Sequence, residues 1–321
     1  MPKLDIIATI NTHKADGALL DGLVRAGATI FRINGAHMRP AQIPTAVKVI
    51  RQCCGDRVKV LIDLPGNKIR TRDLVQTVTL KRGESFALDS VNFSLESFPK
   101  YLKRGDTVIS SDGQLTMSVK EVAPERVIFL AECDGELLNN KGLHVPTAEL
   151  GELPFLWELD RKIIEHSLSS GVDYAGFSFV RTPANIEEAK RALAGSSITP
   201  IFKLETKEAT APQALQSILS RAEIFAIDRG DLASEVGMAS FPATFNRTLS
   251  AGLAAGKKMF VATQLFASMY ERQLPFLSEV VEFHRLAHSG IAGIQLSEET
   301  AIGKHPFEVL AMIATLSSAP K

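Results

Sequence analysis

The amino-acid sequence predicts an α/β protein built on a closed barrel of eight parallel strands, with a small β-rich domain inserted after the third strand. Three observations lead to this prediction. Eight short apolar runs occur along the 321 residues, helical patterns lie between most of these runs, and residues 72–148 depart from the alternation. Short apolar strands that alternate with helices indicate a parallel sheet covered by helices, and eight such units favour a (β/α)₈, or TIM, barrel. A doubly wound open sheet is the alternative, but no GxGxxG segment follows any of the runs, which weakens it.

The expected barrel strands are the apolar runs at 4–10, 28–34, 58–64, 172–179, 199–205, 223–230, 257–263 and 290–297. Clear amphipathic patterns follow the first two runs, at 16–27 and 41–53, and these segments are expected to be helices. Strand and helix therefore follow one another in the order that parallel strands require, because each crossover between parallel neighbours needs room for a helix.

The stretch at 72–148 carries short alternating strands separated by turn residues such as KRG, SDG and CDG. This pattern is typical of an antiparallel β domain. We therefore expect 1–70 to form the first part of the barrel, 71–148 to form an inserted, small β-rich domain, and 149–321 to complete the barrel.

The composition excludes several classes of protein. Lysine plus arginine and aspartate plus glutamate both number 36, so there is no basic excess for nucleic acid or for an acidic membrane surface. No apolar run approaches the ~20 residues of a membrane span, and the N-terminus lacks the layout of a signal peptide. The three cysteines match no metal spacing, and reduced thiols fit a cytoplasmic protein.

Polar residues gather where the predicted strands end, which in such a barrel is where the active site lies. The residues that end or directly follow the runs include Arg32, Asn34, His37, Asp63, Lys68, Arg70, Ser178, Phe179, Lys203, Glu205, Asp228, Asp231, Thr263, Ser297 and Glu298. Structural ion pairs scatter over a surface and contribute little each, so stability alone does not explain this pattern. Such a ring suits an anionic substrate and a hard divalent cation.

The segment IFKLETK places Lys203 and Glu205 two positions apart, so in a strand both side chains point to the same side. They could simply form a salt bridge, or they could be a catalytic lysine beside a metal-binding carboxylate. Glu205 and Asp231 are the best pair of ligands for magnesium or manganese, since they come from neighbouring strands. In DRGDLASE, Asp231 is expected to cap the following helix, whose free N–H groups would bind a carboxylate or phosphate.

Many blocks of the chain resemble, in order, those of the pyruvate kinase family. They are IIATI, FRINGAH, LIDLPGNKIR, SDGQL, NKGLHVP, SFVR, FKLET, DRGDLASE, VATQLFASM and LSEETAIGKHP, which together span nearly the whole chain. The resemblance implies a barrel, a mobile lid inserted after the third strand, and an active site between them. The chain stops after the eighth helix, so the family's C-terminal regulatory domain is expected to be absent. The resemblance is compatible with a homo-oligomer, but the sequence leaves the oligomeric state open.

The resemblance also implies roles for single residues. Lys203 corresponds to the catalytic lysine, Thr263 to the threonine implicated in proton transfer, and Arg32 to the arginine that holds phosphate. Glu205 and Asp231 correspond to the ligands of Mg²⁺ or Mn²⁺. The implied substrate-binding positions are Arg32, Arg70, Ser178, Phe179, Gly230, Asp231, Thr263 and Ser297. The implied nucleotide or phosphate contacts are His37, Asp112 and Lys141, and the implied monovalent-cation ligands are Asn34 and Asp63.

The departures from the family cluster on one side of the site. A serine that would bind potassium is Ala36, and the Thr–Lys pair after the third-strand aspartate is Leu64–Pro65, so the monovalent site is expected to be degraded and potassium dependence weak. Other departures are Thr12 and Asn67 in place of prolines near adenine, Ile302 in place of a lysine, Glu298 in place of glycine, Asp228 in place of a small residue, and PFLSE in place of PTRAE. The enolpyruvate and metal half is nearly complete, whereas the nucleotide half is eroded.

Three functional hypotheses follow. The first is a metal-dependent phosphotransferase that uses phosphoenolpyruvate with ADP or another acceptor. The second is nucleotide-independent enolpyruvate chemistry, such as an oxaloacetate-type decarboxylase or a lyase or aldolase acting through the pyruvate enolate. The third is a non-catalytic, metabolite-binding homologue, against which the intact Lys203, Glu205 and Thr263 argue. We rank the phosphotransferase first because Arg32, Ser178 and the whole lid are kept. The expected partner is phosphoenolpyruvate, pyruvate or a related 2-oxo acid, and binding of ADP or ATP stays open.

Overall fold

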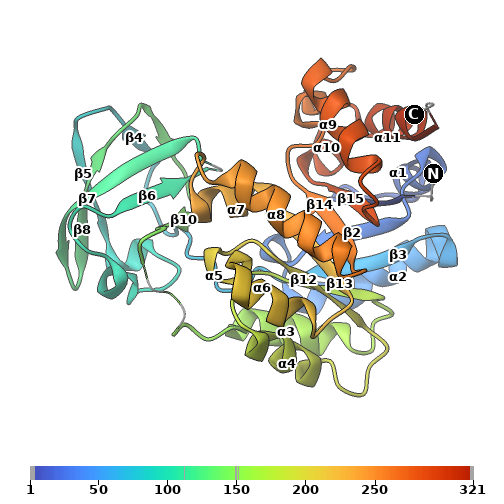
Figure 1. The fold of residues 1–321 in the computed structure, drawn as a ribbon, viewed down its shortest axis with the longest axis horizontal. Coiled ribbons are helices and arrows are strands. Elements are labelled where there is room, and N and C mark those ends of the chain that lie inside the picture. The colour runs from blue at the N-terminus through green and yellow to red at the C-terminus, as the bar shows by residue number, and fades with distance from the viewer. Residues whose placement is uncertain (1–3, 112, 149, 151, 319–321) are drawn as a thin grey trace. The chain divides into compact units, whose positions relative to one another are not determined.

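The computed structural model describes residues 4–111, 113–148, 150 and 152–318. The chain forms two compact units, which the ribbon of Figure 1 shows. The barrel unit comprises Met1–Gly66, Phe155–Arg229 and Asn246–Lys321, and the second unit comprises Asn67–Pro154 and Gly230–Phe245.

Eight parallel strands close the barrel in the order β1-β15-β14-β13-β12-β11-β3-β2, which confirms the predicted fold class. They are β1 (Asp5–Thr9), β2 (Ile30–Asn34), β3 (Lys59–Asp63), β11 (Tyr174–Phe177), β12 (Thr199–Lys203), β13 (Ile224–Asp228), β14 (Lys258–Ala262) and β15 (Gly293–Leu296). Each lies inside one of the apolar runs, because only an apolar strand can be buried on both faces.

The barrel strands alternate with helices (Figure 1). The helices are α1 (Gly17–Ala26), α2 (Ile43–Cys54), α3 (Glu158–Ser167), α4 (Pro183–Ala192), α5 (Lys207–Thr210), α6 (Pro212–Leu219), α7 (Arg229–Val236), α8 (Phe241–Ala254), α9 (Leu277–Ala287), α10 (Glu298–Ala301) and α11 (Pro306–Ser318). Short 3₁₀ turns are η1 (Gly35–His37), η2 (Pro40–Gln42), η3 (Gly55–Arg57) and η6 (Ala267–Tyr270). The first helix shows why the boundaries fall where they do. Asp16 accepts a hydrogen bond from the Leu19 N–H at its start, and Gly27 ends it with φ 119°.

Apolar side chains fill the inside of the barrel. Ile7, Ile30, Leu61, Ile201, Ala226 and Phe260 form one cluster, and each is at most 4% exposed. They come from six different strands, so the barrel is a packed core and not a pore. Polar side chains are therefore confined to the strand ends.

The second unit contains two antiparallel sheets between β3 and β11 in the chain, as expected for a small inserted domain. Its strands are β4 (Val78–Leu80), β5 (Ser85–Asp89), β6 (Thr107–Ser110), β7 (Leu115–Ala123), β8 (Arg126–Ala131), β9 (Gly135–Leu137) and β10 (Leu143–His144), with the 3₁₀ turns η4 (Ser90–Asn92) and η5 (Phe98–Tyr101). The larger sheet has the order β10-β6-β7-β8-β5, and β4 pairs with β9. Stacking of Phe86 on Phe129, with 5.4 Å between ring centroids, supports its core.

Within the part of the chain that the structure covers, no helix combines the length and the apolar character needed to cross a membrane.

Candidate active site

Arg32 and Asp63 form a buried pair at the carboxyl ends of β2 and β3. The Arg32 guanidinium donates through Nε and Nη2 to Asp63 Oδ2, at 2.8 and 2.5 Å. Its third nitrogen, Nη1, donates to Thr9 Oγ1 at 3.0 Å. Gly176 lies beside this pair, and a Cβ atom there would stand only 2.5 Å from Asp63 Oδ1. A glycine at this position is therefore needed to leave room for the carboxylate.

Lys203 ends β12 and lies among three carboxylates. Its Nζ is 3.3 Å from Glu205 Oε2, 3.6 Å from Asp63 Oδ2 and 3.8 Å from Asp228 Oδ2. Lys203 is 6% exposed and Glu205 is fully buried. Lys203 and Glu205 thus do form the salt bridge that IFKLETK suggests, but Asp63 and Asp228 also lie near the lysine. Together with Arg32, the five side chains carry one negative charge in excess, which favours a further cation.

Glu205 is fixed by the backbone next to β11. Its Oε1 accepts the Phe179 N–H at 2.8 Å. Phe179 has φ 56°, which is unusual for a residue with a bulky side chain and costs free energy. The strained turn places this N–H on the carboxylate, so the orientation of Glu205 depends on the strand next to its own.

Thr263 follows β14 in a left-handed conformation. Its φ is 73°, and Gln264 after it has φ 56°. The Thr263 hydroxyl donates to Asp228 Oδ1 at 2.5 Å. A β-branched residue in this region costs about 1–3 kcal/mol, and such strain is found most often at functional sites.

Arg229 stabilises the strained turn at Thr263. Its Nε and Nη2 donate to the Thr263 carbonyl at 2.9 and 2.8 Å, and Nη2 also donates to the Gln264 carbonyl at 2.6 Å. Glu282 of α9 accepts from its Nη1 at 3.1 Å. Sequence reasoning missed this role, because contacts to backbone carbonyls leave no residue pattern. The only available signal was the position of Arg229 directly after a strand-end carboxylate.

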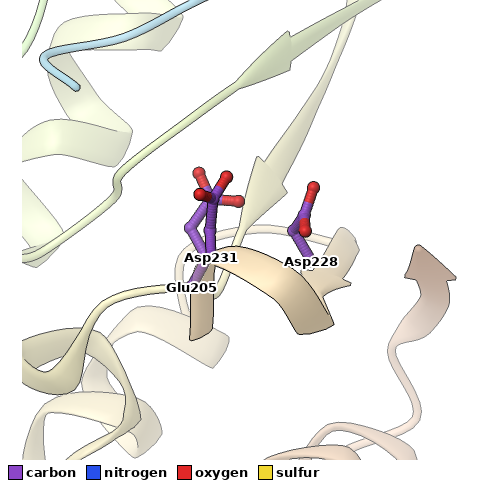
Figure 2. Close-up of side chains that lie close together, drawn as sticks. All are labelled: Glu205, Asp228 and Asp231. Carbon is purple, nitrogen blue, oxygen red and sulfur yellow. The ribbon is translucent and has the colours of Figure 1, made fainter. Parts of the chain in front are cut away.

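Glu205 and Asp228 can both contribute to a divalent-metal site. One carboxylate oxygen of each lies within 4.8 Å of the other. Figure 2 shows these two side chains together with Asp231, the third residue of α7. Two oxygens bound to one magnesium ion are at most about 4.2 Å apart, so a small shift would let one ion contact both. The donor set is all oxygen and negatively charged, which fits magnesium or manganese.

Asp231 is the centre of a second, partly buried cluster, in the second unit. Lys68 donates to its Oδ1, and His144 Nε2 lies 3.3 Å from the same oxygen. The other ring nitrogen of His144, Nδ1, is 3.2 Å from Glu235 Oε1. Burial alone would lower the pKa of His144, but hydrogen bonds to Asp231 and Glu235 outweigh it, so the pKa is raised. His144 and Glu235 were not predicted, since they are separated by 91 residues.

One detail of the sequence prediction is wrong. Asp231 does not cap α7, because the helix already begins at Arg229, directly after β13. Asp231 lies in the first turn instead. A carboxylate there is still favoured by the helix dipole, but it remains available to Lys68 and His144.

Three of the remaining predicted residues bond within the barrel unit. Ser178 Oγ donates to the Leu64 carbonyl at 2.7 Å. The Ser297 N–H donates to Glu299 Oε2 at 2.7 Å, and burial raises the pKa of Glu299. Asn34 Oδ1 accepts the Ala36 N–H at 3.1 Å and so begins η1.

The predicted nucleotide residues are more scattered. His37 is exposed at the end of η1. In the second unit, the backbone of Arg70 forms an isolated antiparallel β-bridge with Gly142. The Lys141 N–H donates to Thr71 Oγ1 at 2.9 Å. Gly230, the second residue of α7, is buried. Asp112 lies outside the described residues.

The departures near the expected adenine position fall in separate units. Thr12 lines a cavity of about 260 Å³ in the barrel unit, together with Met38 and Gln42. Asn67 belongs to the second unit, where its amide donates to the Pro154 carbonyl at 3.2 Å. Ile302 is 48% exposed.

The structure is a closed parallel barrel, and lysine, arginine and carboxylate side chains are buried at the carboxyl ends of its strands. It therefore belongs to the class of TIM-barrel proteins that carry a polar site at this end of the barrel. Comparison with known proteins identifies the family. The model for "Pyruvate kinase, barrel domain" matches residues 1–310. The chain belongs to the pyruvate kinase family.

Curated relatives agree with this assignment. A pyruvate kinase from Thermotoga maritima is 30% identical, with 99% of this chain and 71% of the relative aligned. One from Thermococcus litoralis is 29% identical, over 98% and 69%. Pyruvate kinase 2 from Synechocystis is 31% identical, over 97% and 56%. The chain therefore spans between roughly half and three quarters of the length of these relatives.

Proposed function

We propose that the protein catalyses divalent-metal-dependent phosphoryl transfer between phosphoenolpyruvate and an acceptor, with pyruvate as the other product. The observation that carries this proposal is Lys203, buried within 3.3–3.8 Å of three carboxylates at the carboxyl end of the barrel. The names of the relatives support the same reaction.

Glu205 and Asp231 would hold the divalent ion, and Asp228 is a third candidate ligand. When bound, such an ion neutralises charge on the transferring phosphoryl group and on the enolate oxygen. Asp228 and Asp231 are three positions apart in the chain, at the end of β13 and in the first turn of α7.

The protein's own groups divide the remaining work. The Lys203 ammonium would stabilise the negative charge that develops on the substrate oxygens. Arg32 would bind phosphate, and its fork on Asp63 already fixes the guanidinium plane. Thr263 would deliver a proton to the substrate methylene carbon, and Asp228, which accepts a hydrogen bond from the Thr263 hydroxyl, would position that hydroxyl.

The direct test is to mix the purified protein with magnesium, phosphoenolpyruvate and ADP and to follow pyruvate. We expect pyruvate to form only when the metal is present. ADP should be replaced in parallel reactions by GDP, by inorganic phosphate and by water, because the acceptor is the least constrained part of the proposal. Absence of pyruvate with every acceptor would contradict phosphoryl transfer.

A second candidate function has an observation of its own. Asp228, where the family has a small residue, bonds the Thr263 hydroxyl and lies near Lys203. A carboxylate beside a proton-transferring threonine favours chemistry at the enolate carbon without a nucleotide, such as decarboxylation of a β-keto acid. Incubation with magnesium and oxaloacetate, corrected for the rate without protein, tests this function. Conversion of oxaloacetate above that rate, together with no pyruvate from phosphoenolpyruvate with any acceptor, would favour it.

A further inference from the structure

Gln295 points into the barrel near its carboxyl end. It is the third residue of β15 and is in register with Ile7 of β1 and with Ala262 of β14. Residues in register on parallel strands face the same side. Ile7 belongs to the cluster that fills the barrel, and so does Phe260, two residues before Ala262. The Gln295 side chain therefore faces the interior, two positions before Ser297.

The Gln295 amide is a buried donor for which the described part of the chain supplies no partner. The side chain is 4% exposed, and among the residues that the structure describes nothing accepts a hydrogen bond from its Nε2. Its two neighbours in register, Ile7 and Ala262, carry no polar side-chain atom. A buried amide that is left unmatched destabilises a fold, so this N–H group is available to pair with a polar group of a bound molecule.

The surroundings of Gln295 indicate which part of a ligand would reach it. Ala262 separates Gln295 from Asp228 in one row of registered residues, and Thr263 follows Ala262 directly. Neighbouring strands are about 4.8 Å apart, so Gln295 lies on the side of the site where Thr263 would act on the substrate methylene.

We propose that Gln295 is a specificity-determining residue, which donates a hydrogen bond to a polar substituent on C3 of a 2-oxo acid or its enol phosphate. The preferred substrate class is then a pyruvate derivative that carries a hydroxyl or carboxylate on C3, not pyruvate with its bare methyl group. This inference rests on the proposed function, because it uses the same substrate site.

The test compares two ligands of nearly equal size. 3-Hydroxypyruvate and 2-oxobutyrate differ in carrying a hydroxyl or a methyl group on C3. Calorimetric titration in saturating magnesium should show that the wild-type protein binds hydroxypyruvate about two- to tenfold more tightly, the ratio that one hydrogen bond supplies. Gln295→Met keeps the length of the side chain and removes the donor, so the ratio should fall to about one. Gln216→Met, on an exposed position of α6, is the matched control and should keep the wild-type ratio.

Oxalate, which has no C3, separates this inference from the proposed function. If oxalate binds with magnesium but hydroxypyruvate is not preferred by the wild-type protein, the inference is wrong and the proposed function stands. The same conclusion follows if Gln295→Met keeps the preference, which would indicate that the amide binds only a buried water. If neither oxalate nor any 2-oxo acid binds, both proposals are wrong. A wild-type protein without the preference overturns the inference even if the methionine variant does not fold.

Discussion

Lys203 is the residue on which most of the proposed chemistry depends. We expect Lys203→Met to lower turnover by about 10²–10³-fold or more, because a positioned cation is lost where charge develops. The variant should also melt at a lower temperature, since Asp63, Glu205 and Asp228 lose the cation they share. Steady-state rates and thermal melting measure both effects. Lys203→Arg is the charge-preserving control for stability, and activity of the methionine variant within threefold of the parent would refute the assignment.

The carboxylates of Glu205 and Asp231 are expected to bind the metal directly. Glu205→Gln and Asp231→Asn should each weaken binding of Mn²⁺ by about ten- to a hundredfold, the usual effect of losing one charged contact. Electron paramagnetic resonance of free Mn²⁺ measures this without any turnover. Glu187→Gln, at a partly exposed carboxylate on α4, is the control. Unchanged affinity in both site variants would place the metal elsewhere.

At the scale of elements, Asp160 joins the end of β3 to the start of α3. Its Oδ1 accepts the Gly66 N–H at 3.0 Å, and its Oδ2 accepts the Trp157 N–H at 2.9 Å. Burial raises its pKa from 3.8 to about 6, although the two backbone hydrogen bonds oppose the shift. Gly66 permits this junction, because its φ is 64° and a Cβ atom would stand 3.0 Å from the Ser178 Cβ.

The raised pKa of Asp160 predicts a pH dependence of stability with a definite sign. Between about pH 4 and 6 the folded protein binds more protons at this group than the unfolded chain, so the free energy of unfolding falls as pH rises through that window. The contribution is at most about 3 kcal/mol, from 1.36 kcal/mol per pKa unit. Urea unfolding of the wild type and of Asp160→Asn at several pH values tests this. The difference between the two should change across the window, and a difference independent of pH would contradict the prediction.

The sequence predicts elements better than contacts. All eight barrel strands lie within the apolar runs, since burial on both faces demands apolar residues over the whole strand. Lys203, Glu205 and Asp63 also meet as expected, because parallel strands end at one edge. Arg229 and Gln295 could not be predicted. Arg229 donates to a backbone carbonyl 34 residues away, and such a contact leaves no pattern of residue types. Gln295 stands out because no described residue accepts a hydrogen bond from its amide, which only the structure can show.

At the scale of the whole molecule, the monovalent-cation site is expected to be replaced by a protein charge. Ala36 cannot ligate an ion, and Asn34 uses its amide oxygen to begin η1. Lys68, which is ion-paired with Asp231, is the expected source of a replacing positive charge. We expect activity to change less than about threefold between potassium and tetramethylammonium salts at equal ionic strength. A large activation of the wild-type protein by potassium would contradict this prediction. Lys68→Met removes the replacing charge, so this variant should depend more strongly on potassium.

ADP is expected to bind weakly, with a dissociation constant near the millimolar range. The cavity beside Thr12 offers some room for a base, but Ile302 provides no cation for phosphate and the exposed Glu298 adds a negative charge. Loss of one charged contact costs about ten- to a hundredfold in affinity. Calorimetry with magnesium-ADP, with and without oxalate, measures the affinity. A micromolar value would return the protein to ordinary pyruvate kinase behaviour.

The glycine beside Asp63 has a consequence for comparing natural variants of this chain. Gly176 carries no chemistry, yet any side chain there would collide with a carboxylate that Arg32 holds in place. In a saturation-mutagenesis library, position 176 should therefore tolerate substitution as poorly as Lys203, even though no mechanism mentions it. In a homologous sequence with alanine at this position, the Asp63 carboxylate could not keep its place. Such a protein would be less active than its intact catalytic residues suggest.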